Sequence, residues 1–284
     1  MAKYKILALD LDGTLLNKES VLPEENKIAV RQAQQAGVQI VLCTGRNPIE
    51  AKMFSDDLLA PADWLVTSNG AYICKPDLTQ NIFAQYLSND DCKLLLDICK
   101  EYDTDPCLYT DSQLFYGNAF RRFFRELNIR RNMNPDTKRN HSSFIETDEE
   151  WENLLKTSEK PFIKSILYHD NPNSVDKIIE NLDATGRFEL APSVLFGGLM
   201  KNVEINCKGV HKGNGLKQLT KHLGYTMNDV MAMGDSDNDL TMLEMSGLSI
   251  AMGNAEDHIK EVADECTLTN IEFGVAHSIK RHLL

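Results

Sequence analysis

Short apolar runs that end in polar residues are the feature of this sequence that most constrains its fold. In the first part of the chain these runs are Tyr4–Leu9, Val38–Cys43 and Trp64–Thr67, and helical patterns at 23–36 and 48–59 separate them. Buried strands that alternate with helices predict right-handed crossover connections and a parallel sheet covered on both faces. We therefore expect an α/β fold with a Rossmann-like parallel-sheet core.

The middle of the chain has a different pattern. A helix capped by Ser88 is expected to run to about Tyr102, and two short runs within 108–116 resemble a hairpin. Capping signals at Thr147 and Ser174 predict two more helices. Further strands are expected at Ile166–Tyr168, Phe188–Leu190 and Val203–Ile205. Helices interleaved with hairpin-like strands indicate an inserted α+β domain.

From about Gly209 the first pattern returns. Helices are expected at Lys212–Leu223 and Leu240–Met245, and strands at Val230–Met233 and Leu248–Met252. We therefore divide the chain into an α/β core of residues 1–85 and 208–284 and an inserted domain of residues 86–207. A length of 284 residues is consistent with about two domains.

Charge and cysteine content exclude several classes of protein. The formal net charge of -12 argues against a general nucleic-acid or anionic-membrane binder. The seven cysteines are scattered without a CxxC spacing, so neither a disulfide framework nor a zinc site is expected. No signal peptide is recognisable, and no apolar stretch approaches the roughly 18 residues of a membrane span. We expect a cytoplasmic enzyme, and no obligate protein partner is evident.

Polar residues follow three of the expected strands. They form the segments Asp10–Thr14, Thr44–Arg46 and Gly234–Asp239. In open parallel sheets, ligands bind beyond the carboxyl ends of the strands, so these segments are expected to converge at one edge. Lys212, at the start of a helix, could join them.

The residue types in these segments suit an anionic substrate and a metal. A cluster of carboxylates repels itself unless a cation neutralises it, and ligands that are all oxygen favour Mg²⁺. Thr44 can offer its hydroxyl and the neighbouring amides at a helix start, which is a natural anion site. Phosphoryl transfer needs little beyond positioning and charge stabilisation. Each segment alone could be an ordinary turn and Lys212 alone a surface lysine, but their combination at strand ends is harder to dismiss.

These residues resemble the four motifs of the haloacid dehalogenase superfamily. The motifs are carried by Asp10–Thr14, Thr44–Arg46, Lys212 with Gly213, and Gly234–Asp235 with Asn238–Asp239. The expected insertion is similar in position and length to the α/β cap of the Cof-type phosphatases, and the segments 68–71 and 251–255 also resemble that group. The resemblance implies a phosphatase, in particular one like the bacterial sugar-phosphate phosphatases.

The resemblance also implies a role for each matching residue. Asp10 would be the nucleophile and a Mg²⁺ ligand, and Asp12 would be the general acid and base, with its backbone carbonyl on the metal. Asp235 would bind Mg²⁺ directly, and Asp239 would support the metal site from behind its direct ligands. The phosphoryl oxygens would be held by Leu11, Thr44, Gly45, Lys212 and Asn238, with Arg46 assisting.

Other functions remain open at this point. A phosphomutase would use the same phosphoaspartate chemistry, although the Cof-like pattern favours hydrolysis. A non-catalytic sensor of phosphorylated metabolites is disfavoured, because a binder gains little from an acid/base carboxylate beside a nucleophile. Sugar phosphates are the leading substrates, while nucleotides, flavin mononucleotide and pyridoxal phosphate are alternatives.

Two further features are expected to be structural. His211 precedes Lys212 but lies outside the four motifs. A basic cluster in the cap is interleaved with three phenylalanines, as on an amphipathic helix with a solvated basic face. Its members are Arg121, Arg122, Arg125, Arg130 and Arg131.

Overall fold

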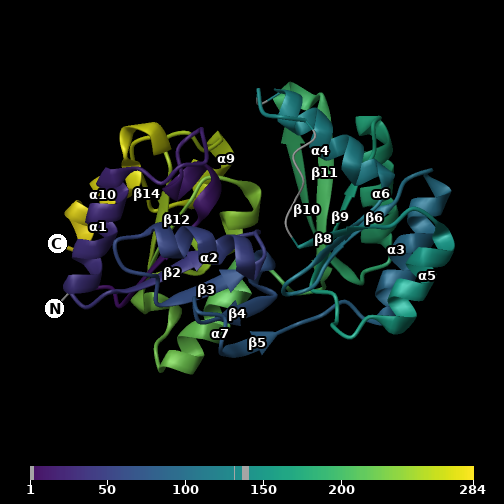
Figure 1. The fold of residues 1–284 in the computed structure, drawn as a ribbon. Helices are drawn as coiled ribbons and strands as arrows, with labels where there is room; N and C mark the ends of the chain where they lie inside the picture. Colours follow the sequence, from purple (N-terminus) through teal and green to yellow (C-terminus); the bar gives the residue numbers. More distant parts are fainter. Residues whose placement is uncertain (1–2, 131, 136–140) are drawn as a thin grey trace. The chain divides into compact units, whose positions relative to one another are not determined.

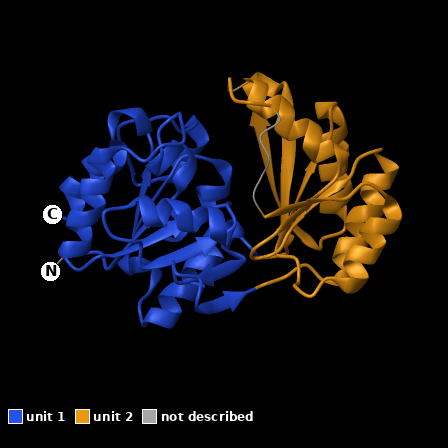
Figure 2. Ribbon diagram, in the orientation of Figure 1, with its two compact units in different colours: residues 1–84, 210–284 blue, residues 85–209 orange. Residues whose placement is uncertain are grey.

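The chain forms two compact units. The structure is a computed structural model that describes residues 3–130, 132–135 and 141–284. Unit 1 consists of residues 1–84 and 210–284, and unit 2 of residues 85–209 (Figure 2).

Unit 1 is built on an eight-stranded sheet (Figure 1). From one edge to the other its strands are β14 (Glu265–Cys266), β13 (Leu248–Ala251), β12 (Val230–Gly234), β1 (Ile6–Leu9), β2 (Gln39–Cys43), β3 (Trp64–Thr67), β4 (Tyr72–Cys74) and β5 (Asn81–Ala84). Neighbouring strands from β14 to β3 pair in parallel, which confirms the predicted parallel core.

The β4–β5 edge of this sheet is antiparallel and was not predicted. The chain reverses after β3 through the turn Ser68–Gly70 instead of entering a crossover helix. Ser68 and Asn69 both adopt positive φ angles, of 52° and 60°. This left-handed backbone makes so tight a reversal possible, and a pattern of apolar residues does not reveal it.

Helices cover both faces of the unit 1 sheet. One face packs against α1 (Glu24–Gln35), α2 (Pro48–Asp57) and α10 (Gly274–His282), and the other against α7 (Lys212–Leu223), α8 (Leu240–Met245) and α9 (Asp257–Val262). In β1, Leu7 and Leu9 belong to the first core, whereas Ile6 and Ala8 belong to the second. Burial on both faces explains why the strand is a continuous apolar run.

Unit 2 contains a six-stranded sheet with helices on both faces. Its strands, in spatial order, are β10 (Phe188–Leu195), β11 (Met200–Cys207), β9 (Lys164–Tyr168), β6 (Pro106–Tyr109), β7 (Leu114–Tyr116) and β8 (Ser142–Phe144). All neighbours pair antiparallel except β7 and β8, which are parallel. One face packs against α3 (Asn89–Glu101), α5 (Asp148–Thr157) and α6 (Pro172–Ala184), and the other against α4 (Asn118–Arg130).

Two of the three predicted helix caps in unit 2 are confirmed. Ser88 and Thr147 both form capping boxes, at the starts of α3 and α5. The prediction of Ser174 as a cap is wrong, because α6 begins earlier and its cap is Asn171, whose side chain accepts from the amide of Asn173. Pro172 sets this start, since its fixed φ suits the first helical position.

Arg121, Arg122 and Arg130 of α4 make contacts within unit 2. Arg122 bonds to Asp170 at 2.7 Å and Arg130 to Glu126 at 2.6 Å, while Arg121 lies over the Phe144 ring. Arg131, the last member of the predicted basic cluster, lies outside the described residues. Within the stretches that the structure covers, no helix combines the length and apolar character required to cross a bilayer.

Candidate functional site

Three adjacent strands bring the predicted polar segments to one edge of the unit 1 sheet. Leu9 at the end of β1 pairs with Leu42 of β2 on one side and with Met233 of β12 on the other. The chain passes from β1 to β2 on one side and later returns to β12 on the other. Such a reversal of strand order is where open α/β sheets bind their ligands.

Lys212 forms the centre of the site. Its Nζ lies 2.6 Å from an oxygen of Asp10 and 2.6 Å from an oxygen of Asp239, and its side chain is fully buried. Burial alone would lower the pKa of Lys212, but Asp10 and Asp239 raise it above its ordinary value. The two carboxylates therefore keep the side chain of Lys212 positively charged. Lys212 is the first residue of α7, so the start of this helix positions it.

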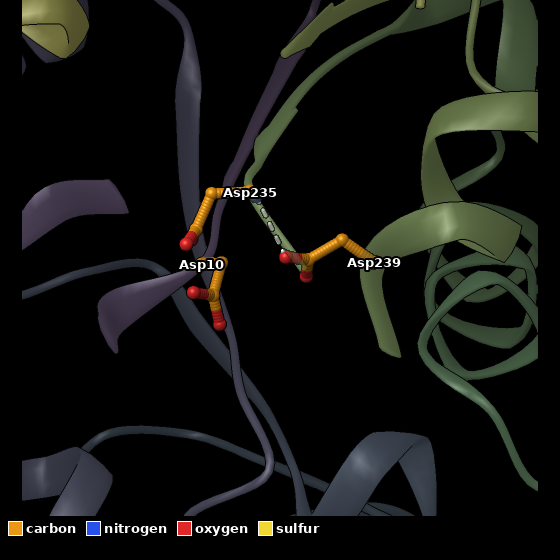
Figure 3. A group of neighbouring side chains, drawn as sticks. All are labelled: Asp10, Asp235 and Asp239. Carbon is orange, nitrogen blue, oxygen red and sulfur yellow. Dashed lines mark hydrogen bonds between the residues drawn. The ribbon is translucent and has the colours of Figure 1, made fainter. Parts of the chain in front are cut away.

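Asp10, Asp235 and Asp239 form an acidic cluster around this lysine. One oxygen from each lies within 4.8 Å of the others (Figure 3). Burial, and after it repulsion by Asp239, raises the pKa of Asp10 well above its usual value, against the attraction of Lys212. Burial and then Asp239 also raise the pKa of Asp235 to about 7. One lysine thus does not balance the cluster, and the all-oxygen donor set fits a hard divalent cation such as Mg²⁺.

Asp239 is fixed from two sides. One of its oxygens accepts from Lys212, and the other accepts from the amides of Asp235 and Ser236 at 2.9 and 3.1 Å. A Cβ on Gly234 would come within 2.5 Å of Asp239, so only glycine fits there. Asp239, expected behind the direct metal ligands, lies in the same group of candidate ligand oxygens as Asp10 and Asp235.

The turn after β1 also holds Asp235. Thr14 donates its hydroxyl to an oxygen of Asp235 at 2.7 Å. Gly13 has a φ of +83°, and a Cβ there would lie 2.2 Å from Asp235 Oδ2. Thr14 was not among the predicted site residues, although its place in the same polar segment as Asp10 was a signal that could have identified it.

Asp12 is bound by Arg46 and not by the cluster. Nε and a terminal nitrogen of Arg46 donate to the two oxygens of Asp12 at 2.7 and 2.6 Å. The Arg46 guanidinium lies 4.8 Å from the centre of the Phe54 ring. The Asp12 side chain is 53% exposed, so this carboxylate stands at the surface of the site, unlike Asp10.

Thr44 and Asn238 are linked through Asn69. The amide of Asn69 donates to the carbonyl of Thr44 at 3.1 Å, and the side chain of Asn238 donates to the side chain of Asn69 at 3.3 Å. Thr44 and Leu11 are buried, and Gly45 follows Thr44 in the same loop. Asn69 lies in the segment 68–71 that shares the resemblance to the family, but it was not among the predicted site residues.

His211 caps α7. Its Nδ1 accepts from the amide of Asn214 at 3.2 Å. This agrees with the structural interpretation of His211 and accounts for its position immediately before Lys212.

Comparison with known proteins gives matches along nearly the whole chain. A sequence model described as haloacid dehalogenase-like hydrolase matches residues 7–279. The 5-amino-6-(5-phospho-D-ribitylamino)uracil phosphatase YcsE of Bacillus subtilis (strain 168) is 32% identical over 280 residues, which cover 99% of this chain and 96% of that protein. Phosphatase YwpJ of the same organism is 33% identical, with 99% and 100% covered. A solved haloacid dehalogenase-like hydrolase from B. subtilis has a TM-score of 0.83 at 28% identity, with 99% and 100% covered.

Proposed function

Because the chain belongs to the haloacid dehalogenase-like hydrolases and is a phosphatase, we propose that it uses Mg²⁺ and a phosphoaspartate on Asp10 to hydrolyse small phosphorylated metabolites. The observation that carries this proposal is the buried pair of Asp10 and Lys212 at the strand reversal, beside Asp235 and Asp239. A carboxylate in this position can attack an electrophile, and the lysine can hold the negative charge that arrives with it.

The metal would be held by Asp10, Asp235 and the backbone carbonyl of Asp12, with Asp239 in support. Bound Mg²⁺ would offset the repulsion among the carboxylates and polarise the phosphoryl oxygens. The raised pKa values of Asp10 and Asp235 mean that, without a metal, both acids tend to hold a proton. Both have to be ionised for their proposed roles, and a bound cation would favour the ionised forms, which supports this assignment.

The proposed reaction has two steps. First, a carboxylate oxygen of Asp10 attacks phosphorus in line while the bond to the leaving oxygen breaks, and Asp12 gives that oxygen its proton. Second, ionised Asp12 takes a proton from water as the water oxygen attacks phosphorus. The bond between Asp10 and phosphorus then breaks, which releases inorganic phosphate and restores both carboxyl groups.

The phosphoryl oxygens would be held by Lys212 and by donors of the loops after β1, β2 and β12, namely the Leu11 amide, Thr44, Gly45 and Asn238. Arg46 can take part without releasing Asp12. A guanidinium has five N–H donors, and the two bonds to Asp12 leave the others available for a phosphoryl oxygen.

For the substrate we propose sugar phosphates or related phosphorylated polyols. The relative YcsE acts, by its name, on a phosphorylated ribityl chain, which is an open-chain sugar alcohol. We assign the choice among such compounds to unit 2. The proposed reaction needs no nucleic acid, membrane or protein partner. We propose that it takes place in the cytoplasm.

The test is phosphate release from a panel of phosphorylated sugars, polyols, nucleotides and cofactors, with Mg²⁺ and with EDTA. Wild type should turn over members of the panel only with Mg²⁺, and Asp10→Asn should be inactive. A matched control is Asp56→Asn, which makes the same change at an exposed site on α2 and should keep full activity.

Circular dichroism has to show that Asp10→Asn is folded. Phosphate release by a folded and pure Asp10→Asn variant would refute the phosphoaspartate step. Formation of an isomeric sugar phosphate without net phosphate release would identify a mutase instead of a hydrolase.

A further inference from the structure

Asp235 receives a hydrogen bond on each of its two oxygens. Thr14 donates to Oδ1 at 2.7 Å, and Asn254 donates through Nδ2 to Oδ2 at a longer 3.4 Å. Thr14 lies 221 residues from Asp235 in the sequence and Asn254 lies 19 residues from it. Together they limit rotation of the carboxylate plane, which a metal ligand on a loop requires for a defined geometry.

The amide of Asn254 is fixed at both ends. Its Nδ2 also donates to the carbonyl of Gly13 at 2.9 Å, and its Oδ1 accepts from the amide of Asn270 at 2.9 Å. The donors and acceptors around it therefore define which end is nitrogen and which is oxygen. The end that faces the carbonyl of Gly13 and Asp235 is therefore the nitrogen, which can donate to both.

The backbone beside Asn254 is held as well. The amide of Gly253 donates to the carbonyl of Leu268 at 3.0 Å, and a Cβ on Gly253 would lie 2.8 Å from the amide nitrogen of Thr269. Asn270, next in this segment, donates its side chain to the carbonyl of Leu16 at 2.8 Å. Asn254 and Asn270 thus both bond to the turn after β1, at Gly13 and at Leu16. Asn254 also bonds to Asp235.

Asn254 lies at an exposed position, yet its polar atoms bond to the protein instead of only to water. A structural tie between two loops would need the bonds to Gly13 and Asn270 alone. The additional approach of Nδ2 to Asp235 joins the turn that carries Asp10 to the loop that carries the second candidate metal ligand.

We propose that Asn254 is a positioning residue that orients the Asp235 carboxylate for the metal. The inference rests on the proposed function, because it takes Asp235 to be a metal ligand. Asn254 acts through Asp235 and through the turn at Gly13, and it is not itself a ligand. Because Mg²⁺ demands near-ideal octahedral geometry and Ca²⁺ tolerates irregular coordination, a loosened Asp235 should impair Mg²⁺ binding more than Ca²⁺ binding.

The experiment measures binding of Mg²⁺ and of Ca²⁺ by calorimetry and by metal-dependent thermal stabilisation, so it does not depend on catalysis. Asn254→Ala should weaken Mg²⁺ binding roughly tenfold and Ca²⁺ binding clearly less. Asn270→Ala is the matched control, because it removes the neighbouring tie to Leu16 and leaves Asp235 untouched. It should lower the melting temperature and leave both metal affinities as in wild type.

The outcomes separate this inference from the proposed function. Wild-type Mg²⁺ binding together with unchanged binding by Asn254→Ala would overturn the inference and leave the metal site standing. An equal loss for both metals, shared by Asn270→Ala, would reduce Asn254 to a structural tie and overturn it as well. If wild type bound no Mg²⁺ at all, both the inference and the metal dependence of the proposed function would fall.

Discussion

Replacing Asp235 by asparagine should stabilise the metal-free protein at alkaline pH. The pKa of Asp235 is raised from 3.8 to about 7, so its folded form binds a proton more tightly than its unfolded form does. The stability contributed by that proton is fully present below pH 3.8 and is lost as the pH rises through about 7. Asparagine has no ionisable proton to lose, so the variant lacks this part of the decline.

The size of the effect follows from the shift. A difference of roughly 3 pKa units corresponds to about 4 kcal/mol, since one unit is worth about 1.4 kcal/mol. Partial exposure of Asp235 reduces this value, and the oxygen of the new amide can accept from only one of the two donors, Thr14 and Asn254. We therefore expect a gain of about 1–3 kcal/mol in the free energy of unfolding at about pH 8.

The assay is urea unfolding in EDTA at about pH 5 and about pH 8, repeated with Mg²⁺. Wild type should lose more stability than Asp235→Asn between the two pH values and should regain it with Mg²⁺, whereas the variant should gain little from the metal. The exposed control Asp56→Asn should follow wild type, because it removes a carboxylate at the surface of α2 and leaves Asp235 unchanged. The reasoning is refuted if Asp235→Asn is less stable than wild type at about pH 8 in EDTA, or if both decline equally.

Three further predictions concern the residues around the cluster. Lys212→Met should cost about 3–5 kcal/mol because it leaves two buried carboxylates without their cation, and mild acid should restore part of the loss; equal stability in urea unfolding would contradict this. Gly13→Ala should cost at least about 1–2 kcal/mol for its positive φ and should abolish stabilisation by Mg²⁺, since its Cβ would displace Asp235; thermal melts with and without Mg²⁺ measure both effects. Arg46→Lys breaks the two-bond contact to Asp12 at a partly exposed site, so stability should change by less than about 1 kcal/mol while phosphate release falls by up to about 100-fold; unchanged turnover would show that this contact does not orient the acid.

Much of the fold could be predicted because its elements depend on local periodicity and caps. The helices at Lys212–Leu223 and Leu240–Met245 and the strand at Trp64–Thr67 have the bounds that the pattern predicts. The capping boxes at Ser88 and Thr147 were readable because each needs only residues three positions apart.

Two features of the fold were not predicted correctly, namely the antiparallel β4–β5 edge and the start of α6. The β4–β5 edge follows the turn Ser68–Gly70, in which all three residues have positive φ angles. The Asn69–Gly70 pair was a local turn signal that could have identified this reversal, whereas the left-handed backbone of Ser68 has no sequence signal. The start of α6 was misplaced by three residues because several cap residues compete around Pro172, and only the folded chain selects Asn171.

For the site, the sequence by itself determined which chemical groups would stand at the ends of the strands. Asp10, Thr44 and Asp235 follow three strands, and parallel pairing brings such positions to one edge whatever the rest of the chain does. The types and order of these residues also carried the resemblance to the family that the comparisons establish.

Only the tertiary structure decided which partner each group has. Lys212 reaches Asp10 across 202 residues and Asn254 reaches Gly13 across 241, while Asp12 turns to Arg46 instead of the metal cluster. The physical reason is that a hydrogen bond requires its donor and acceptor within about 3.5 Å of each other and suitably aligned. Strand register, helix starts and backbone turns place them there jointly, and none of these can be read from a single motif.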